Sequence, residues 1–566
     1  MARWKYHKEI PAEFPVPDKN LIEVFYESVQ KNGDLPFVIF QDRAKSFNQS
    51  WKEVVKFANV LSSLGIKKGE RVAILMPNCP QFVISYLSTL YLGGIVTAIS
   101  PLYTEKEIQF QLKDSGSRVI VTLDLFLENV RKVRGKTDLK HVIVSSVADE
   151  LSAIKGFLYK TIINRKSPKP NENELIYSKL MKNAEEKDLR AKIDPKNDLA
   201  CLQYTGGTTG VPKAAMLTHT NLLSNAMTIH YWEWWVGGPQ GKQLNNMGAL
   251  PLSHIFGLTT SFMWPLYSGG MVVLIPDPRK LEDIMKAIEK YDIHFFCGVP
   301  TLYQKMAQHP AITKYSFATL RGCISGGSAL HQDTMDQFEA KTDSILVEGY
   351  GLSEAAPVTH INPADKKLRK PGIGIPIPNT KAKIIHLETG ETITEFDKNG
   401  FTTPEGELVI KGPQVMKGYW KRQDETDKVF TEDGWLKTGD VVHMTKDGFF
   451  NIVDRLKDCI FTSGFQVWPL DVETVLCNHP DISMAAVIPV KDENVNEVIK
   501  AVLVAAQGAK QYTFAELKAY CKENLAPYKV PKYFEYREEL PLSPVGKVLR
   551  RPLREEAEKV AVKQKK

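Results

Sequence analysis

The sequence predicts an α/β protein with two parts: a long N-terminal part of parallel sheets with crossover helices, and a small C-terminal α+β part. Its 566 residues correspond to about three to four units of roughly 150 residues each. Hydrophobic residues make up 43% and charged residues 25%, the balance of a globular protein with ample core. Segments with helical spacing alternate with short β-branched runs over most of the chain, an order typical of parallel strands joined by helices.

The alternation begins with two helix and strand pairs. Residues 52–64 carry apolar side chains at helical spacing and precede the strand-like run RVAILM at residues 71–76. Residues 82–92 and 94–99 repeat this order. Because each predicted helix leads the chain back to start another strand, we expect the strands to pair in parallel. Further strand-like runs are residues 117–122, 141–144, 271–275 and 320–325.

The C-terminal part begins past residue 440, where the pattern of alternating helices and strands changes. Short strand signals punctuated by glycine lead to the charged run DRLKD at residues 454–458. We therefore predict one domain of residues 1–456 and a second of residues 457–566. The predicted elements of the second domain are a helix at residues 471–478, strands at 484–490 and 499–505, a helix at 513–524 and a basic tail at 550–566.

Composition and patterning argue against several classes of protein. The formal net charge of +7, from 73 basic and 66 acidic residues, does not favour nucleic-acid binding. Seven scattered cysteines without a C-x-x-C pair indicate a reduced, zinc-free protein. No apolar run follows the basic N-terminus, and Pro251 and Pro265 interrupt the longest uncharged stretch, residues 243–276. We therefore expect a cytoplasmic protein without a secretory signal or membrane span.

The alternation of helices and strands breaks down between residues 151 and 195. Leu151, Ile154, Leu158 and Ile162 share one face of a predicted helix, and basic residues surround them. Two interpretations stay open. The commoner case is a surface helix that packs on its own domain, and the other is a basic helix that attaches the protein weakly to the inner face of a membrane.

The strongest chemical signal is the segment YTGGTTGVPK at residues 204–213. Its glycines let backbone N–H groups approach an anion, its threonines add hydroxyl donors, and Lys213 adds a positive charge. A polyphosphate is the ligand that suits these groups. The segment differs from a Walker loop because Val211 and Pro212 separate the last glycine from the lysine.

Three further segments carry side chains suited to a nucleotide. The run VEGYGLSE at residues 347–354 offers Tyr350 for stacking on a base and Glu354 for a divalent cation. Asp440 follows a tight turn, where its two oxygens can accept both hydroxyls of a ribose. Lys547 stands on a loop shaped by glycine and proline near the C-terminus. Each signal is weak alone, so the interpretation depends on their order and spacing.

In this order and spacing the segments resemble the adenylate-forming superfamily of acyl-CoA synthetases, firefly luciferases and adenylation domains, and are most similar to its medium- and long-chain fatty acid–CoA ligases. The resemblance implies a large N-terminal domain of stacked sheets flanked by helices, and a small mobile domain that swivels at Lys457. It implies catalytic roles for Lys547, Glu354, His254 and Thr205, with Mg²⁺ held by Thr205 and Glu354. The nucleotide-binding residues that it implies are Thr205, Gly206, Gly207, Thr208, Thr209, Gly210, Lys213, Gly326, Gly327, Ser328, Gly349, Tyr350, Gly351, Ser353, Asp440, Arg455, Lys457 and Gly464.

The resemblance also implies a reaction in two halves. A carboxylate attacks the α-phosphate of ATP to give acyl-AMP and pyrophosphate, and the thiol of coenzyme A then displaces AMP. We expect a medium- or long-chain fatty acid as the acyl donor. The alternatives are an acyl-AMP ligase that serves a carrier protein and a ligase for a short-chain or aryl acid. The resemblance also leaves open that the protein forms a homodimer. Luciferase activity is disfavoured, because Phe461 stands where luciferases have a lysine.

The acyl pocket is predicted around the run LPLSHIFG at residues 250–257. The resemblance implies that His254 lies beside the substrate carboxylate, whereas a core histidine with a satisfied hydrogen bond is the alternative. Glycines at positions 257, 298, 326 and 351 suggest a deep pocket with room for a chain. The substrate-binding residues expected from the resemblance are His254, Phe256, Gly257, Leu258, Cys297, Gly298 and Val299.

Overall fold

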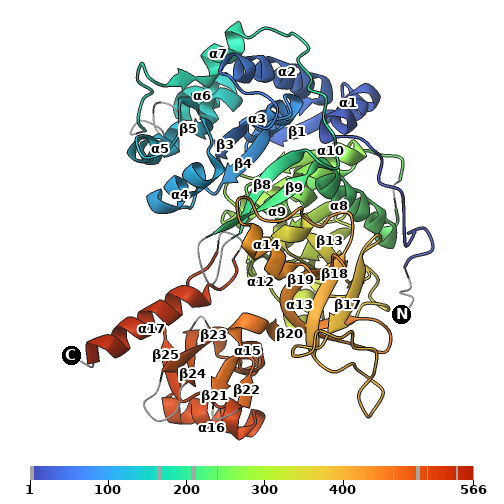
Figure 1. The fold of residues 1–566 in the computed structure, drawn as a ribbon, viewed down its shortest axis with the longest axis vertical. Coiled ribbons are helices and arrows are strands. Elements are labelled where there is room, and N and C mark those ends of the chain that lie inside the picture. Colours follow the sequence, from blue (N-terminus) through green and yellow to red (C-terminus); the bar gives the residue numbers. More distant parts are fainter. Residues whose placement is uncertain are drawn as a thin grey trace.

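The computed structural model describes residues 6–159, 161, 167–205, 212–238, 240–462, 465–491, 497–506, 508–543 and 546–564. Two large sheets, with helices between and around them, make up most of the N-terminal part (Figure 1). The seven-stranded sheet has the order β7 (Leu175–Ile176), β6 (His141–Ser145), β5 (Val119–Leu123), β3 (Arg71–Leu75), β4 (Ile95–Ile99), β8 (Leu199–Thr205) and β9 (Lys213–Thr218).

The second sheet has nine strands. Their order is β16 (Ile375–Pro376), β15 (Val358–Ile361), β14 (Ile345–Gly351), β13 (Gly322–Ser325), β12 (Phe295–Gly298), β10 (Asn245–Gly248), β11 (Met271–Leu274), β1 (Pro36–Phe40) and β2 (Arg43–Ser46). Neighbouring strands in the centre of both sheets are parallel, which confirms the predicted α/β class. Among the described strands of these two sheets, antiparallel pairs occur only toward the edges, as in β8 with β9 and β14 with β15.

Several helices of the N-terminal part begin where a side chain accepts bonds from their first N–H groups. The helix predicted at residues 52–64 begins earlier, because Ser46 and Gln49 form a capping box. The helices are α1 (Leu21–Asn32), α2 (Phe47–Ser63), α3 (Pro80–Tyr91), α4 (Glu105–Ser115), α5 (Leu127–Arg134), α6 (Ala153–Leu158), α7 (Tyr177–Asn183), α8 (His219–Trp232), α9 (Ile255–Leu258), α10 (Trp264–Ser268), α11 (Leu281–Lys290), α12 (Pro300–Gln308), α13 (Gln332–Thr342) and α14 (Gln423–Val429).

Helix α3 lies between the two large sheets. It contacts β1 of the nine-stranded sheet as well as β3 and β4 of the seven-stranded sheet. All of its residues are buried, and the polar side chains among them, such as Gln81, Ser88 and Thr89, donate to backbone carbonyls. The core of the N-terminal part therefore extends from one sheet through this helix to the other.

A four-stranded antiparallel sheet leads toward the C-terminal part. Its strands are β17 (Lys381–Ile385), β18 (Gly406–Lys411), β19 (Leu436–Met444) and β20 (Phe450–Arg455). The short helix η8 (Leu456–Asp458) then connects β20 to the C-terminal elements. These elements are β21 (Ile460–Thr462), β22 (Phe465–Val467), α15 (Pro469–Cys477), β23 (Ile482–Lys491), β24 (Glu497–Ala505), α16 (Phe514–Asn524), β25 (Tyr533–Tyr536) and α17 (Arg550–Gln564).

The C-terminal part has a hydrophobic core of its own, formed by β23, β24, α15 and α16. The predicted basic tail is helical as α17, and Leu553 of this helix packs against Ala486 and Ile488 of β23. In Figure 1 the C-terminal part lies below the N-terminal part, and α17 lies at its left side. Its packing explains why α15, α16, β23 and β24 fall at the positions predicted from sequence.

Helix α6 occupies part of the segment where the predicted alternation fails. Its side chains Ile154, Phe157 and Leu158 are 77%, 67% and 47% exposed, so its apolar groups do not pack on the domain. Ile162 lies outside the described residues. Among the helices described, none has the length and apolar character needed to cross a membrane.

Candidate active site

A cavity of about 780 Å³ lies between the two large sheets of the N-terminal part and the C-terminal loop that carries Lys547. Strands β8, β9 and β14 and helix α9 contribute residues from the N-terminal side. The sequence-predicted residues that line it are Thr205, Lys213, His254, Phe256, Gly326, Gly327, Gly349, Tyr350, Gly351, Ser353, Glu354, Arg455, Lys457 and Lys547. The fold therefore brings separate segments of the chain, from β8 to the loop before α17, together around one cavity.

The other sequence-predicted residues have different positions. Asp440 is buried and bonds to Tyr350 and Arg455, and Ser328 is exposed. Leu258, Cys297 and Val299 are buried in the hydrophobic core. Neither these three nor Gly257 and Gly298 line the cavity in the part of the chain that the structure describes. Outside the described residues lie Gly206, Gly207, Thr208, Thr209, Gly210 and Gly464.

Asp440 forms the centre of a polar group behind Tyr350 and Arg455, two residues that line the cavity, but is not itself a lining residue. It stands opposite Arg455 in the β19 and β20 ladder, and Arg455 Nε lies 3.0 Å from Asp440 Oδ1. The Tyr350 hydroxyl donates to Asp440 Oδ2 at 2.5 Å. Burial first, and then the Asp440 charge, raise the pKa of Tyr350 well above its usual range. Each carboxylate oxygen retains a second lone pair, and Asp440 holds the two lining residues Tyr350 and Arg455 in place.

Lys213 and Glu354 lie at the end of the cavity formed by β8, β9 and η7 (Ser353–Ala355). The Thr205 hydroxyl donates to the Lys213 carbonyl at 3.3 Å, which links the ends of β8 and β9. The Lys213 ammonium pairs with Glu425 and lies 5.1 Å from the centre of the Tyr419 ring. The Tyr419 hydroxyl donates to Glu354 Oε1 at 2.7 Å, which leaves Oε2 available. The Lys213 ammonium and the Glu354 carboxylate therefore lie on the same wall of the cavity.

Lys547 is half-buried and lies among other cations. Burial first, and then the charge of Arg455, lower the pKa of its ammonium to about 7. An incoming anion has the opposite effect, because it stabilises the charged form of the lysine. Lys547 is therefore suited to bind an anionic group at this point of the cavity.

The loop that carries Lys547 docks against the N-terminal part. The Ser543 N–H donates to the Lys547 carbonyl at 2.7 Å, and the Lys547 N–H donates to the Ser543 hydroxyl at 3.1 Å. Gly546 has a φ of +72°, and a Cβ atom there would lie 3.1 Å from the Thr301 hydroxyl of α12. Glycine therefore allows both the turn and the close approach of the two parts.

His254 is the N-cap of α9 and faces the cavity. Its Nδ1 accepts the Phe256 N–H at 3.2 Å, so the neutral ring carries its proton on Nε2. Burial first, and then the Lys547 charge, lower the pKa of His254 to about 4. The ring is therefore neutral near pH 7, with Nε2–H as a donor.

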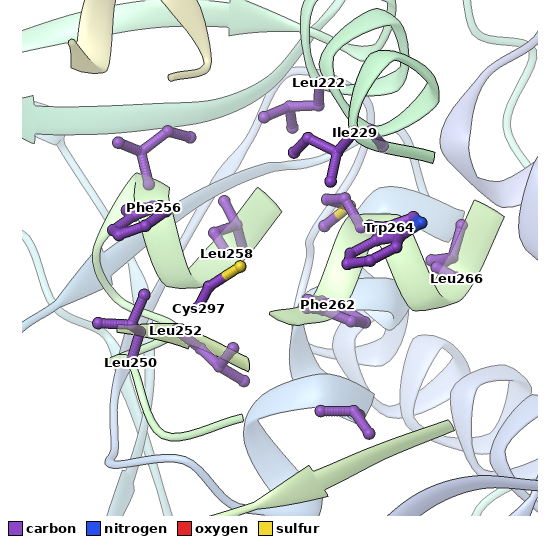
Figure 2. Packing of buried hydrophobic residues seen from close by; sticks show 14 of the residues in the cluster. Leu222, Ile229, Leu250, Leu252, Phe256, Leu258, Phe262, Trp264, Leu266 and Cys297 are labelled. Atoms are coloured by element: carbon purple, nitrogen blue, oxygen red, sulfur yellow. The ribbon is translucent and has the colours of Figure 1, made fainter. Parts of the chain in front are cut away.

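The four glycines interpreted as pocket depth are sites of close packing, and two of them, Gly326 and Gly351, also line the cavity. A Cβ atom on Gly257 would lie 2.4 Å from the Pro251 carbonyl, and one on Gly351 would lie 2.1 Å from the Pro357 carbonyl. At positions 298 and 326 it would meet the rings of Tyr303 and Phe256 at 3.0 and 3.1 Å. Figure 2 shows Phe256 in the same buried region as Leu258 and Cys297.

Sequence reasoning missed several polar and charged residues of the cavity wall, and those nearest Lys213 come from one segment, which also contributes Asp424. Tyr419, Arg422 and Glu425 line the cavity, and all three come from the segment that leads into α14 and its first turn. The run GYWKRQDE at residues 418–425 has no chemical signature of its own. A bridge between Ala215 and Tyr419 and the neighbouring backbone hydrogen bonds bring this segment against β9, so its place in the site depends on tertiary structure.

Comparison with protein families identifies the chain. A family model described as AMP-binding enzyme matches residues 25–420, and a second described as AMP-binding enzyme C-terminal domain matches residues 471–547. The chain belongs to the AMP-binding enzyme family. This confirms the resemblance noted from the sequence motifs, including the two-part organisation of large and small domains in related structures.

Two relatives of this AMP-binding enzyme match nearly its full length. A long-chain-fatty-acid–CoA ligase of Bacillus subtilis is 40% identical, and the match covers 98% of this chain and 97% of the relative. A long-chain-fatty-acid–CoA ligase of Escherichia coli O157:H7 is 37% identical with the same coverage. Both names agree with the fatty acid–CoA ligases that the motifs resemble.

Solved structures of other AMP-binding enzymes share the fold. ATP-bound MatB from Rhodopseudomonas palustris is 27% identical and has a TM-score of 0.80, with 96% of this chain and 100% of that chain covered. Apo MatB, at the same identity, covers 96% of this chain and 99% of that chain, with a TM-score of 0.69. The arrangement of this AMP-binding enzyme is therefore more similar to the ATP-bound form of that protein than to its apo form.

Proposed function

We propose that this protein is an AMP-forming acid–thiol ligase that activates a medium- or long-chain fatty acid with ATP and transfers the acyl group to coenzyme A. The observation that carries the proposal is the shared cavity, in which Lys547 of the C-terminal part joins Lys213, Glu354 and His254 of the N-terminal part. The names of the full-length relatives support the fatty acyl substrate. The predicted domains of residues 1–456 and 457–566, with a pivot at Lys457, belong to the same proposal.

In the first half-reaction Lys547 would lie between the substrate carboxylate and the α-phosphate. Two unit anions about 4 Å apart repel by about 4 kcal/mol at an effective dielectric near 20, so a cation between them removes much of this barrier. The neutral His254 would donate its Nε2–H to a carboxylate oxygen and orient the attacking atom. Lys213 would bind the β- and γ-phosphates that leave as pyrophosphate.

The nucleoside end of the cavity would hold the rest of ATP. Arg455, which lines the cavity, and Asp440 behind it would bind the ribose, and Tyr350 would form the wall beside the adenine. The Tyr350 hydroxyl holds one Asp440 oxygen in place, so the carboxylate is oriented before a ligand arrives. These contacts would fix the α-phosphate relative to Lys547.

The residues present fit a magnesium ion that arrives with the nucleotide. Mg²⁺ is usually bound through one or two carboxylates together with substrate phosphates. Glu354 Oε2 and the Thr205 hydroxyl line the wall that Lys213 shares, and they would hold the ion. When bound, it offsets charge on the leaving pyrophosphate. Within the described ranges, no three His, Cys, Asp or Glu side chains gather into a metal cluster.

A panel of carboxylic acids tests the proposed substrate. We expect pyrophosphate release with ATP to be fastest for octanoate and palmitate and slow for acetate and benzoate, because an extended apolar chain adds binding energy for each buried methylene. AMP release with and without free coenzyme A distinguishes coenzyme A from a carrier protein as acceptor. Fastest turnover with benzoate or acetate would contradict the fatty acyl assignment.

We further propose that the protein works in the cytoplasm and docks weakly on the inner face of a membrane through α6. The exposed side chains Ile154 and Phe157 are suited to the boundary between headgroups and acyl chains. In co-sedimentation with anionic vesicles at low salt, Phe157→Glu is expected to reduce binding several-fold. Phe401, which is 71% exposed on the N-terminal part, provides the control Phe401→Glu. Equal binding by both variants would refute docking through α6.

A further inference from the structure

The cation proposed to bind the phosphates already has an internal carboxylate partner. Lys213 stands at the start of β9 and pairs with Glu425 in the first turn of α14. Both side chains line the cavity, and both are only partly exposed, at 34% for Lys213 and 27% for Glu425. The ammonium also lies over the Tyr419 ring, 5.1 Å from its centre. Lys213 is therefore neutralised by the protein itself when no phosphate is bound.

Glu425 has a second cation that stays with it if Lys213 leaves. Lys213 bonds to Oε2 of the carboxylate, whereas Lys428 Nζ lies 2.8 Å from Oε1. Lys428 is one turn further along α14 and is 67% exposed. Lys213 first, and then Lys428, lower the pKa of Glu425 to about 2. Without Lys213 the carboxylate is still ionised near pH 7, because the ordinary pKa of a glutamate is about 4.3. Release of Lys213 therefore leaves Glu425 charged but still paired.

The other charged groups of this wall already have partners. Arg422 pairs with Asp114 at 3.1 Å, and Glu354 accepts the Tyr419 hydroxyl at 2.7 Å. Asp424 lies 4.0 Å from Lys428. Within the described part of the wall, Glu425 is thus the carboxylate that holds Lys213, and an incoming phosphate must take its place.

We propose that Glu425 is an internal substitute for the polyphosphate: it competes with the β- and γ-phosphates for Lys213, and so weakens binding of ATP and speeds release of pyrophosphate. This inference rests on the proposed assignment of Lys213 to the phosphates. If Glu425 instead positioned Lys213 for its ligand, its removal would weaken phosphate binding. The two roles therefore predict changes of opposite sign in affinity.

The test measures the dissociation constants of ATP and of inorganic pyrophosphate in magnesium buffer by calorimetry. Glu425→Gln keeps the size of the side chain and removes its charge, and we expect both ligands to bind about three- to tenfold more tightly, as loss of one competing ion pair allows. The pyrophosphate dissociation rate should fall by a similar factor. Asp427→Asn is the matched control, because Asp427 is an exposed carboxylate two residues along α14 and does not line the cavity.

The Lys213→Ala background separates competition from a general effect of charge. In that background Glu425→Gln should not tighten pyrophosphate binding, since the cation for which Glu425 competes is gone. Weaker binding in Glu425→Gln, or tightening equal to that of Asp427→Asn, would overturn the inference. Unchanged pyrophosphate binding in the single variant Lys213→Ala would instead refute the assignment of Lys213 on which it rests. Thermal unfolding of each variant checks that the fold is retained.

Discussion

Replacement of Lys547 by alanine is expected to reduce acyl-AMP formation by about 10²- to 10³-fold, the usual cost of removing one preorganised charge donor from a transition state. Lys547 reaches the cavity from the C-terminal part, where burial first, and then the charge of Arg455, lower the pKa of its ammonium. An anionic carboxylate and α-phosphate restore the charged form, so its contribution is realised when both substrates are bound. The loss should therefore fall on the first half-reaction.

The measurement compares the two half-reactions. Pyrophosphate release reports the first, and thioester formed from supplied acyl-AMP and coenzyme A reports the second. We expect the second to change little in Lys547→Ala. Lys559→Ala is the control, because Lys559 is an exposed lysine of α17, the helix that follows the Lys547 loop. Equal losses in both half-reactions would show that Lys547 has no specific role in adenylation.

The second large effect is expected at the pivot: Lys457→Pro should leave acyl-AMP formation nearly intact and slow transfer to coenzyme A by about tenfold or more. Proline holds φ near −65°, and a swivel between two arrangements of the parts needs this dihedral to change. Lys457 lies in the short connection η8 between β20 and β21. The variant should therefore retain the arrangement in which Lys547 faces the cavity.

Two kinds of contact flank the proposed pivot at Lys457: one that a swivel would have to break, and one that would move with the C-terminal part. The Leu470 N–H at the start of α15 donates to Asp454 Oδ2 at 2.7 Å, across the connection. Beyond it, Arg550 and Arg554 of α17 bind the two oxygens of Asp458 at 3.1 and 2.9 Å. Lys457→Ala is the control, because alanine removes the side chain but leaves φ free. Normal transfer to coenzyme A in the proline variant would exclude Lys457 as the pivot.

Local patterns in the sequence were sufficient for most elements and for the family. The strands at residues 71–76 and 94–99 were predictable because a parallel strand buried on both faces is a short apolar run bounded by turn residues. The family followed from motifs such as YTGGTTGVPK, in which neighbouring residues act together on one ligand. Strands and motifs that depend on neighbouring residues in the chain could therefore be predicted from the sequence alone.

The site contacts depended on residues far apart in the chain, which periodicity does not encode. The pairing of Lys213 with Glu425 and of Tyr350 with Asp440 arises only when β14, β19 and α14 meet around one cavity. Gly257 illustrates the same limit, since its carbonyl neighbour at Pro251 is visible only after the turn into α9 has formed. The sequence by itself thus determined the elements, the two parts and the family, whereas tertiary packing decided which charges pair, because ion pairs and close contacts depend on distance in space.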